Sequence, residues 1–311
     1  MTSKLPSLAA LRRVLAVAAA GTVAIGCGSG SDDAVGPSIV VTHSVLGAVV
    51  RDIVGDAADV TVLIPDGVDP HDWEPSAQDL ELVTGADLVV ANGLGFESGL
   101  EDALRNAVDS GVTVFEATDY VTIREGAHSD EEAHGEAEKE DHADEDPHFW
   151  TDAAAMAEVA EALEVFLFDA GVEVGDRAGM TAERLITLDN ELRETAESLA
   201  VERRTLVTGH ESLGYFADRY GFTLVGAVVP SLTTQAEVSA GEIAELKAQV
   251  EAAGVDVVFS ELGTPDKTVT AIADEVGARV VEISTHVLPE DGSYETFMRD
   301  LMTTIVEALS A

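Results

Sequence analysis

The chain has 311 residues, enough for two lobes that each bury a hydrophobic core. Hydrophobic residues make up 46% of it, a fraction that excludes wholesale disorder. Its 59 acidic and 17 basic residues give a formal net charge of -42, so it should repel nucleic acids and anionic lipid headgroups. The composition therefore argues against a nucleic-acid partner. It suits either a cationic ligand or simple solubility.

The N-terminus has the organisation of an export signal. Basic residues up to Arg13 precede an uncharged run over 14–26 that is too short to span a bilayer. Cys27, the only cysteine of the chain, follows directly. This pattern resembles a bacterial lipoprotein signal. It predicts a signal peptide over 1–26, lipid attachment at Cys27, a tether over 27–37 and a location on the outer face of the cell membrane. The alternative is an ordinary cleaved signal with an incidental cysteine.

Short valine-rich runs alternate with amphipathic stretches through the rest of the chain. Strands are expected at 38–42, 60–64, 87–91 and 112–115, and again at 205–208, 223–228, 255–260 and 279–283. Such alternation of strands and helices is typical of parallel sheets that are covered by helices on both faces. The sequence therefore predicts an α/β fold with two lobes, 38–175 and 202–311, each a mostly parallel sheet flanked by helices.

A long helix and an acidic loop interrupt this alternation. Leucines recur at helical spacing between 176 and 201 with no proline among them, which predicts one helix joining the two lobes. The stretch 128–148 has ten acids, one lysine and four histidines without apolar periodicity, so we expect a solvated loop over 124–147. The loop histidines His128, His134 and His142 are candidates for auxiliary metal binding, because imidazole is a common metal ligand. A variable solvated insertion is the alternative.

The remaining histidines share a position relative to the predicted strands. Four of them, His43, His71, His210 and His286, follow a strand by a few residues, and His148 lies just before a predicted helix. In open parallel sheets, ligands bind beyond the carboxyl ends of the strands. The sequence thus predicts one cleft with several imidazoles. No short zinc motif is present, so this site would be assembled from distant segments.

Four segments carry a family resemblance. They are "DGVDPHDWEPSAQDL" (66–80), "NGLGFESGLEDAL" (92–104), "DPHFWTD" (146–152) and "TGHESLGYFADRYG" (208–221). Together they resemble the metal-specific solute-binding proteins of bacterial ABC transporters, the receptors for zinc and manganese. The resemblance covers nearly all of the chain after the tether. It implies two α/β lobes bridged by a rigid helix, one metal ion in the cleft and a membrane permease as partner.

The same resemblance implies a set of metal ligands. The family's first three ligands correspond to His71, His148 and His210. Where many members place an aspartate as the fourth ligand, this chain has His286. Nearby carboxylates, Glu261 and Asp291, are the alternative fourth ligands. His43 matches no family role and is left unassigned.

The expected ion and function follow from this ligand set. Four imidazoles favour Zn²⁺, whereas Mn²⁺ prefers carboxylate and water ligands. We therefore expect a monomeric, extracytoplasmic zinc receptor that delivers its ion to an ABC permease and catalyses no reaction. The alternatives are a manganese-specific relative, an adhesin of the same fold, or a zinc hydrolase with Glu261 or Glu211 as its base.

Overall fold

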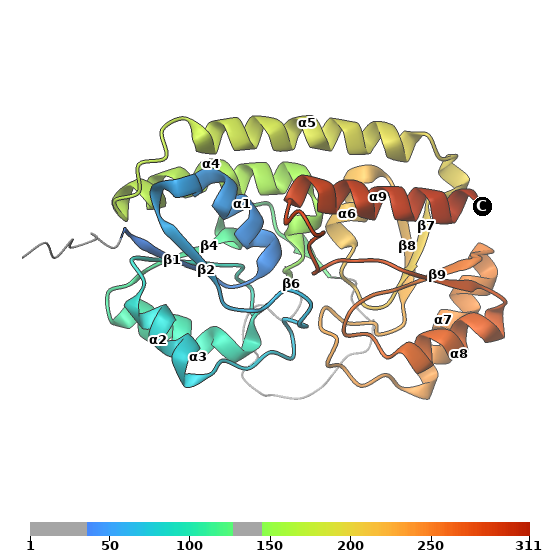
Figure 1. Ribbon diagram of the computed structural model, residues 1–311. Helices are drawn as coiled ribbons and strands as arrows, with labels where there is room; N and C mark the ends of the chain where they lie inside the picture. Colours follow the sequence, from blue (N-terminus) through green and yellow to red (C-terminus); the bar gives the residue numbers. More distant parts are fainter. Residues whose placement is uncertain (1–35, 127–144) are drawn as a thin grey trace, which may run out of the picture. The chain divides into compact units, whose positions relative to one another are not determined.

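The computed structural model describes residues 36–126 and 145–311, and Gly36–Ala311 forms one compact unit. The N-terminal lobe contains a parallel sheet with strand order β2-β1-β3-β4 (Figure 1). Its strands are β1 Ser38–Val41, β2 Asp59–Val62, β3 Leu88–Ala91 and β4 Thr113–Glu116. The helices of this lobe are α1 Ser44–Val54, α2 Ala77–Gly85 and α3 Glu101–Asp109.

The side chains of β1 explain how this sheet is covered on both faces. Successive strand residues point to opposite faces. Ile39 and Val41 belong to the hydrophobic cluster that includes α1, whereas Val40 packs in a separate cluster with residues of α2 and α3. Figure 1 shows the corresponding layers, with α1 on one side of the sheet and α2 and α3 on the other. A continuous apolar strand such as β1 therefore packs against helices on both faces of the sheet.

The C-terminal lobe has two parallel strand pairs. Strand β7 Thr205–Thr208 pairs with β8 Thr223–Ala227, and β9 Val257–Ser260 pairs with β10 Arg279–Glu282. Strand β7 lies beside β9. The helices of this lobe are α6 Gly214–Tyr220, α7 Ala240–Ala253, α8 Asp266–Val276 and α9 Tyr294–Ser310.

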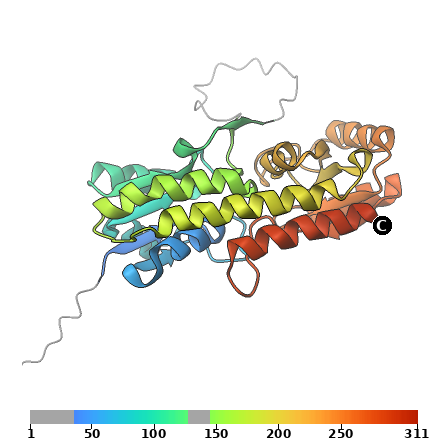
Figure 2. The same ribbon diagram turned by 90° about the horizontal axis from the view of Figure 1, so that it is seen from above.

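One long helix runs along both lobes and is flanked by two other long helices (Figure 1). Helix α5 Arg177–Glu197 packs against α4 Ala153–Asp169 and α9, and Figure 2 shows it lying between them. Its buried Leu185, Leu188 and Leu192 belong to one hydrophobic cluster that extends from β1 to Phe259 of β9. Each buried leucine contributes roughly 1.5–3 kcal/mol to folding. Since the lobes share this core, we expect them to move less than lobes joined by loops.

The predicted fold class is confirmed, and the predicted strands are present with ends that differ by at most two residues. The helix expected over 176–201 is α5, which is followed by a 3₁₀ turn at Val201–Arg203. Sequence periodicity defines where an element lies better than where it ends, because helix and strand ends depend on local capping.

The expectation of a solvated loop over 124–147 is wrong at both ends of that segment. Strand β5 Arg124–Glu125 pairs with β6 Glu145–Asp146 in an antiparallel arrangement. Asp146 and the following His148 are fully buried. An acidic composition predicts solvation only for acids that lack a partner, and Asp146 has partners that are described below. The signal segment, Cys27, His128, His134 and His142 lie outside the described residues.

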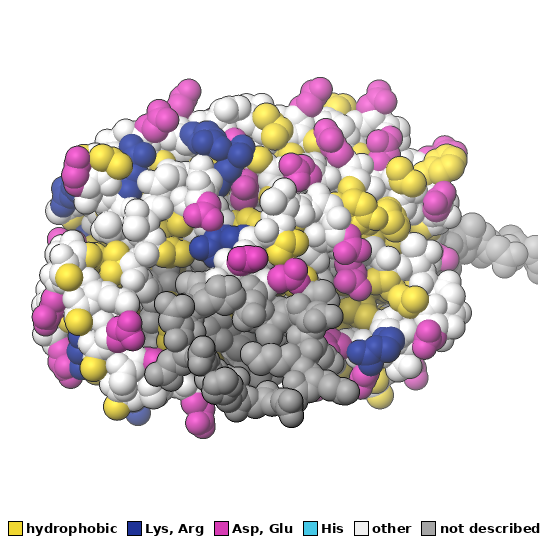
Figure 3. All heavy atoms as spheres, turned by 180° about the vertical axis from the view of Figure 1, so that it is seen from behind, with side chains coloured by type: hydrophobic (Ala, Val, Ile, Leu, Met, Phe, Trp, Pro, Cys, Tyr) yellow, Lys and Arg dark blue, Asp and Glu magenta, His cyan; other side chains and the backbone are white. Residues whose placement is uncertain are grey.

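The acidic side chains are spread over the surface. Figure 3 shows acids scattered across one face of the molecule, with few basic residues among them. This distribution fits a contribution of the charge to solubility. Among the residues that the structure describes, no helix has the length and apolar character needed to cross a bilayer.

Candidate metal centre

Four histidines from distant parts of the sequence meet in one buried cluster. His71 follows β2, His148 follows β6, His210 follows β7 and His286 follows β10. Their exposed fractions are 5%, 0%, 0% and 4%, respectively. One ring nitrogen of each lies within 4.8 Å of the corresponding nitrogens of the others. The structure thus brings together three of the four strand-end histidines, His71, His210 and His286, and the predicted loop residue His148 joins them.

The spacing of one pair of ring nitrogens matches that of a tetrahedral metal site. Nε2 of His71 and Nε2 of His148 are 3.4 Å apart. Nitrogens at the corners of a tetrahedron, each ~2.0–2.1 Å from zinc, are roughly 3.3 Å from one another. Nε2 of His210 and Nε2 of His286 are buried without a hydrogen-bond partner in the described part of the chain. Unpaired buried nitrogens are costly, and a cation at the centre of the cluster would satisfy them.

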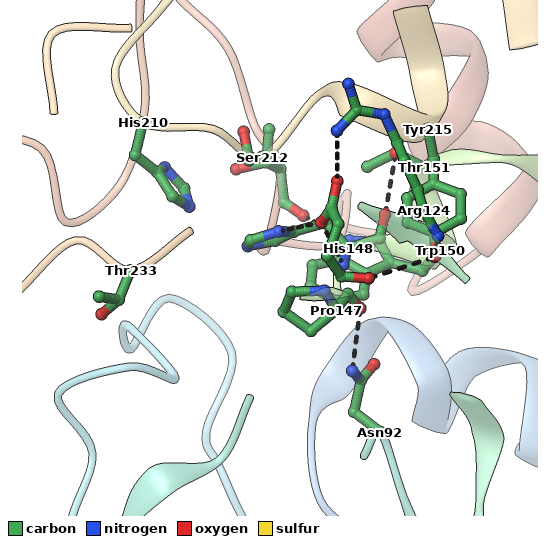
Figure 4. A network of polar contacts seen from close by, with 12 residues as sticks. Asn92, Arg124, Pro147, His148, Trp150, Thr151, His210, Ser212, Tyr215 and Thr233 are labelled. Atoms are coloured by element: carbon green, nitrogen blue, oxygen red, sulfur yellow. Dashed lines mark hydrogen bonds and ion pairs between the residues drawn. The ribbon is translucent and has the colours of Figure 1, made fainter. Parts of the chain in front are cut away.

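A carboxylate holds the ring of His148 from behind. Nδ1 of His148 lies 2.8 Å from Oδ1 of Asp146, which also accepts the backbone N–H of His148 at 3.0 Å. Arg124 donates to the other oxygen of Asp146 at 3.3 Å (Figure 4). Because Nδ1–H donates to the carboxylate, Nε2 keeps its lone pair for the cluster. Carboxylates that orient metal-binding imidazoles in this way are common in metal sites.

Glu261 performs the same task for two imidazoles in the C-terminal lobe. Its Oε1 accepts the backbone N–H of His210 at 3.0 Å and lies 3.3 Å from Nδ1 of the same residue, an ion-pair distance without hydrogen-bond geometry. Its Oε2 accepts hydrogen bonds from Ser212 Oγ at 2.6 Å and Thr285 Oγ1 at 2.8 Å. Thr285 Oγ1 is also 2.9 Å from Nδ1 of His286. Since the one hydroxyl proton of Thr285 goes to the carboxylate, Thr285 accepts from His286, which leaves Nε2 of His286 unprotonated.

Burial determines the charge of most of these imidazoles. It lowers the pKa of His71 and His286 well below 6.5, and the neighbouring histidines lower both further. Burial also lowers the pKa of His148, although Asp146 opposes the shift. Burial disfavours the charged form of His210 as well, but Glu261 outweighs it and raises the pKa of His210. Three of the four imidazoles are thus neutral at pH 7, the state that binds a metal.

A third acidic residue, Asp69, fixes the loop that carries His71. Asp69 Oδ1 accepts the backbone N–H of His71 at 3.0 Å, and its Oδ2 accepts a hydrogen bond from Thr234 of the C-terminal lobe at 2.6 Å. Gly263 lies against the same carboxylate with φ 84°, and a Cβ there would be 2.2 Å from Oδ2 of Asp69. Only glycine fits this close approach. The contact links the His71 loop to the loop that carries Glu261.

Aromatic rings cover the cluster on the N-terminal side. The ring of Phe96 lies 5.0 Å from that of His71 and stacks on His286 at 6.1 Å, and Trp150 lies 5.2 Å from His148. Phe96 follows a turn in which Leu94 has φ 53°, a conformation that costs roughly 1–2 kcal/mol outside glycine. Sequence reasoning did not assign Phe96, Trp150, Asp146 or Thr285 a role. The sequence signals were that Asp146, Trp150 and Thr285 lie in or beside the "DPH" and "STH" segments, and that Phe96 lies in the segment 92–104.

The other candidate residues occupy different surroundings. His43 is buried behind the aromatic rings, 5.2 Å from Phe96 and 5.1 Å from Trp150, and is not part of the four-histidine group. Both oxygens of Glu261 are engaged as described above. Asp291 is exposed, and its carboxylate accepts hydrogen bonds from Ser293 N and Thr296 Oγ1 at the start of α9.

The two-lobed α/β fold and the buried imidazole cluster define a metal-binding protein. Residues 39–308 match the family described as zinc-uptake complex component A, periplasmic, and the chain belongs to this family. The family resemblance stated from the sequence is thereby confirmed. The family consists of metal-binding receptors of ABC-type uptake systems, which work with membrane permeases and are not enzymes.

Individual relatives of the chain bind different metals. It is 28% identical to the manganese-binding lipoprotein MntA of Halalkalibacterium halodurans over 93% of this chain and 95% of MntA. It is 30% identical to the zinc-binding protein TroA of Treponema pallidum over 90% and 92% of the two chains. The solved structure of TroA covers 88% of this chain and 99% of TroA, with a TM-score of 0.73 and 26% identity. The identity of the ion must therefore be argued from this chain's own residues.

Proposed function

We propose that this chain is a zinc receptor, with His71, His148, His210 and His286 as the four ligands. The observation that carries the proposal is the composition of the cluster, which contains four imidazoles and no carboxylate. Zinc accepts four nitrogen ligands in a tetrahedron, whereas manganese favours oxygen ligands and more of them. The neighbouring acids Asp146 and Glu261 are engaged in orienting imidazoles, which leaves the ligand positions to nitrogen.

The proposal assigns no reaction to this site. A catalytic zinc site keeps one position open for water or substrate. Here four imidazoles would occupy all four positions of the tetrahedron, which leaves no open position. Glu261, the candidate base of a hydrolase, is buried and hydrogen-bonded to Ser212 and Thr285. The protein would instead bind the ion, carry it and release it to the permease.

The proposal extends to the location of the protein. We assign 1–26 to a signal peptide, Cys27 to lipid attachment and 27–37 to a tether that holds a monomeric receptor at the outer face of the membrane. The basic, apolar and cysteine-containing start of the sequence supports this assignment. We also propose that His128, His134 and His142 bind further ions weakly, because histidine is dense in that acidic segment.

A competition between metals tests the proposed function. The metal-free protein is titrated with Zn²⁺ and with Mn²⁺ against a chelator of known affinity for each. We expect one tight zinc site and much weaker manganese binding. His286→Asp is the matched variant, and it should shift the preference towards manganese because it adds an oxygen ligand. Equal affinities of the parent protein for the two metals would contradict the assignment to zinc.

A further inference from the structure

The C-terminal lobe has a second cavity, outside the metal cluster, along the free edge of β10. Its volume is about 1030 Å³, at the upper end of the ~300–1,000 Å³ that is typical of small-molecule pockets. Residues of β10, of α8 and of α9 line it, among them Val280, Val269 and Leu301. Together, β10, α8 and α9 form an open groove rather than a closed cavity.

The backbone of β10 has hydrogen-bonding groups that point into this groove. Within the described residues β10 pairs only with β9. Arg279 N donates to Asp256 O and Ile283 N to Ser260 O, so alternate residues direct their N–H groups at that neighbour. The N–H groups of Val280 and Glu282 therefore point away from it. Free strand edges of this kind are templates for another extended chain.

The two helices supply apolar walls. Phe297, Leu301 and Thr304 recur at helical spacing along α9, and Val269 and Thr270 lie on the α8 side. Val269, Phe297 and Leu301 are almost fully buried, so they form the packed base of the groove. Val280 is 40% exposed at the strand edge between them. An extended peptide has side chains on both faces, which would contact α8 on one side and α9 on the other.

The negative charge of the groove indicates the kind of partner it would bind. Its lining includes Asp266, Glu282 and Asp300, all exposed, and contains no lysine or arginine. In the described part of the chain these three acids form no ion pair. A second copy of this chain would bring like charges together at this edge, which is unfavourable. A basic partner would instead neutralise them.

We propose that this groove binds an extended segment of a partner protein that alternates basic and apolar residues, paired with the free edge of β10. The backbone supplies affinity, the α8 and α9 walls accept the apolar side chains, and the three carboxylates bind the basic ones. The proposal concerns the part of the cavity along β10 and uses none of the four imidazoles, although Glu261, which supports the metal centre, also lines the cavity. It does not depend on which metal the protein carries.

Fluorescence anisotropy of a labelled peptide tests the proposal. The probe is a heptapeptide in which lysine or arginine alternates with valine, added to the full chain at physiological salt. The control probe has the same sequence but carries methyl groups on alternate backbone nitrogens, which preserves its charge and prevents strand pairing. We expect the first probe to bind at least tenfold more tightly, because a tenfold ratio corresponds to about 1.4 kcal/mol of lost hydrogen bonding.

Variants of the groove provide the second comparison. Glu282→Lys with Asp300→Lys should weaken the probe at least tenfold. The charge-matched control, Asp274→Lys with Glu307→Lys, changes exposed acids of α8 and α9 outside the groove and should alter binding less than twofold. Val280→Pro should also weaken binding, because it removes an outward N–H while leaving the pairing with β9 intact.

Four results would overturn the proposal. Equal binding of the two probes, or equal effects of the two double variants, would show only unspecific attraction to an acidic protein. Absence of binding at millimolar peptide would exclude the site. Sedimentation of the full chain as a dimer that Val280→Pro dissociates would show that a second copy occupies the edge.

Discussion

The two lobes hold their metal-site imidazoles by different means. In the N-terminal lobe, Asp146 orients only His148, while the ring of His71 is positioned through the backbone of its loop. In the C-terminal lobe, Glu261 orients His210 directly and His286 through the hydroxyl of Thr285. A single carboxylate therefore controls half of the cluster. Equivalent ligands therefore need not be equally vulnerable to loss of their supporting residues.

Glu261→Gln should produce the largest effect, because it disturbs two imidazoles and removes the charge beside His210. Loss of one such supporting partner reduces metal affinity about 10–100-fold. We expect zinc affinity to fall about 100-fold, measured by chelator competition. The conservative variant Glu261→Asp tests whether the charge alone suffices, and it should recover only part of the loss. A change below tenfold for Glu261→Gln would show that Glu261 does not control both rings.

Two buried histidines, His43 and His210, should respond to pH in opposite ways. His43 has no carboxylate among the groups that shift it, and burial lowers its pKa to about 3, whereas Glu261 raises the pKa of His210. In the folded state His43 stays neutral at pH 5, but in the unfolded chain it is protonated below 6.5. The unfolded state therefore binds more protons, and the contribution of His43 to stability decreases as pH falls below 6.5. His210 has the opposite effect. Its contribution to stability is present below pH 6.5 and is lost as the pH rises through the pKa of His210 in the folded state.

His43→Asn isolates this contribution. Between pH 7 and pH 5, the metal-free parent should lose about 2 kcal/mol more unfolding free energy than the variant does. Glu261 does not interfere, because its pKa is lowered to about 2 and its contribution is lost only below 4.5. Denaturant unfolding at the two pH values measures the difference. Parallel pH profiles for the parent and variant would contradict the buried, neutral state of His43.

Asp146→Asn should have a smaller effect on zinc than Glu261→Gln. Asparagine keeps the hydrogen bond to the backbone of His148 but removes the charge, and only one ligand depends on it. We expect zinc affinity to fall about tenfold. The comparison uses the same chelator assay for both variants. If Asp146→Asn proves as damaging as Glu261→Gln, the asymmetry between the lobes is wrong.

Thr285→Val gives the smallest and most specific effect. It keeps the shape of the side chain but removes the hydroxyl that joins Glu261 to His286. We expect zinc affinity to fall about three- to tenfold. Nitrogen NMR of the metal-free protein should show that His286 no longer favours the Nδ1-protonated tautomer, while Thr285→Ser retains it. An unchanged tautomer in the valine variant would show that the Thr285 hydroxyl does not set the tautomer of His286.

The sequence predicted the ligand-bearing positions better than it predicted their support. Strand-end histidines can be located from valine-rich runs, because parallel strands bring their carboxyl ends to one edge. The role of Thr285 could not be predicted, since it depends on Glu261, 24 residues earlier in the chain. Asp146 was assigned to a solvated acidic segment, because composition does not show that Arg124 and His148 share its carboxylate. These roles depend on side-chain contacts between distant residues, which the local sequence pattern does not predict.

X-ray absorption at the zinc edge of the zinc-loaded full chain tests the central claim, that four imidazoles bind the ion. We expect four nitrogen scatterers at about 2.0–2.1 Å with the multiple scattering of imidazole rings. His286→Ala should replace one nitrogen with oxygen from water. A carboxylate oxygen in the shell of the parent protein, unchanged in His286→Ala, would contradict the four-histidine site.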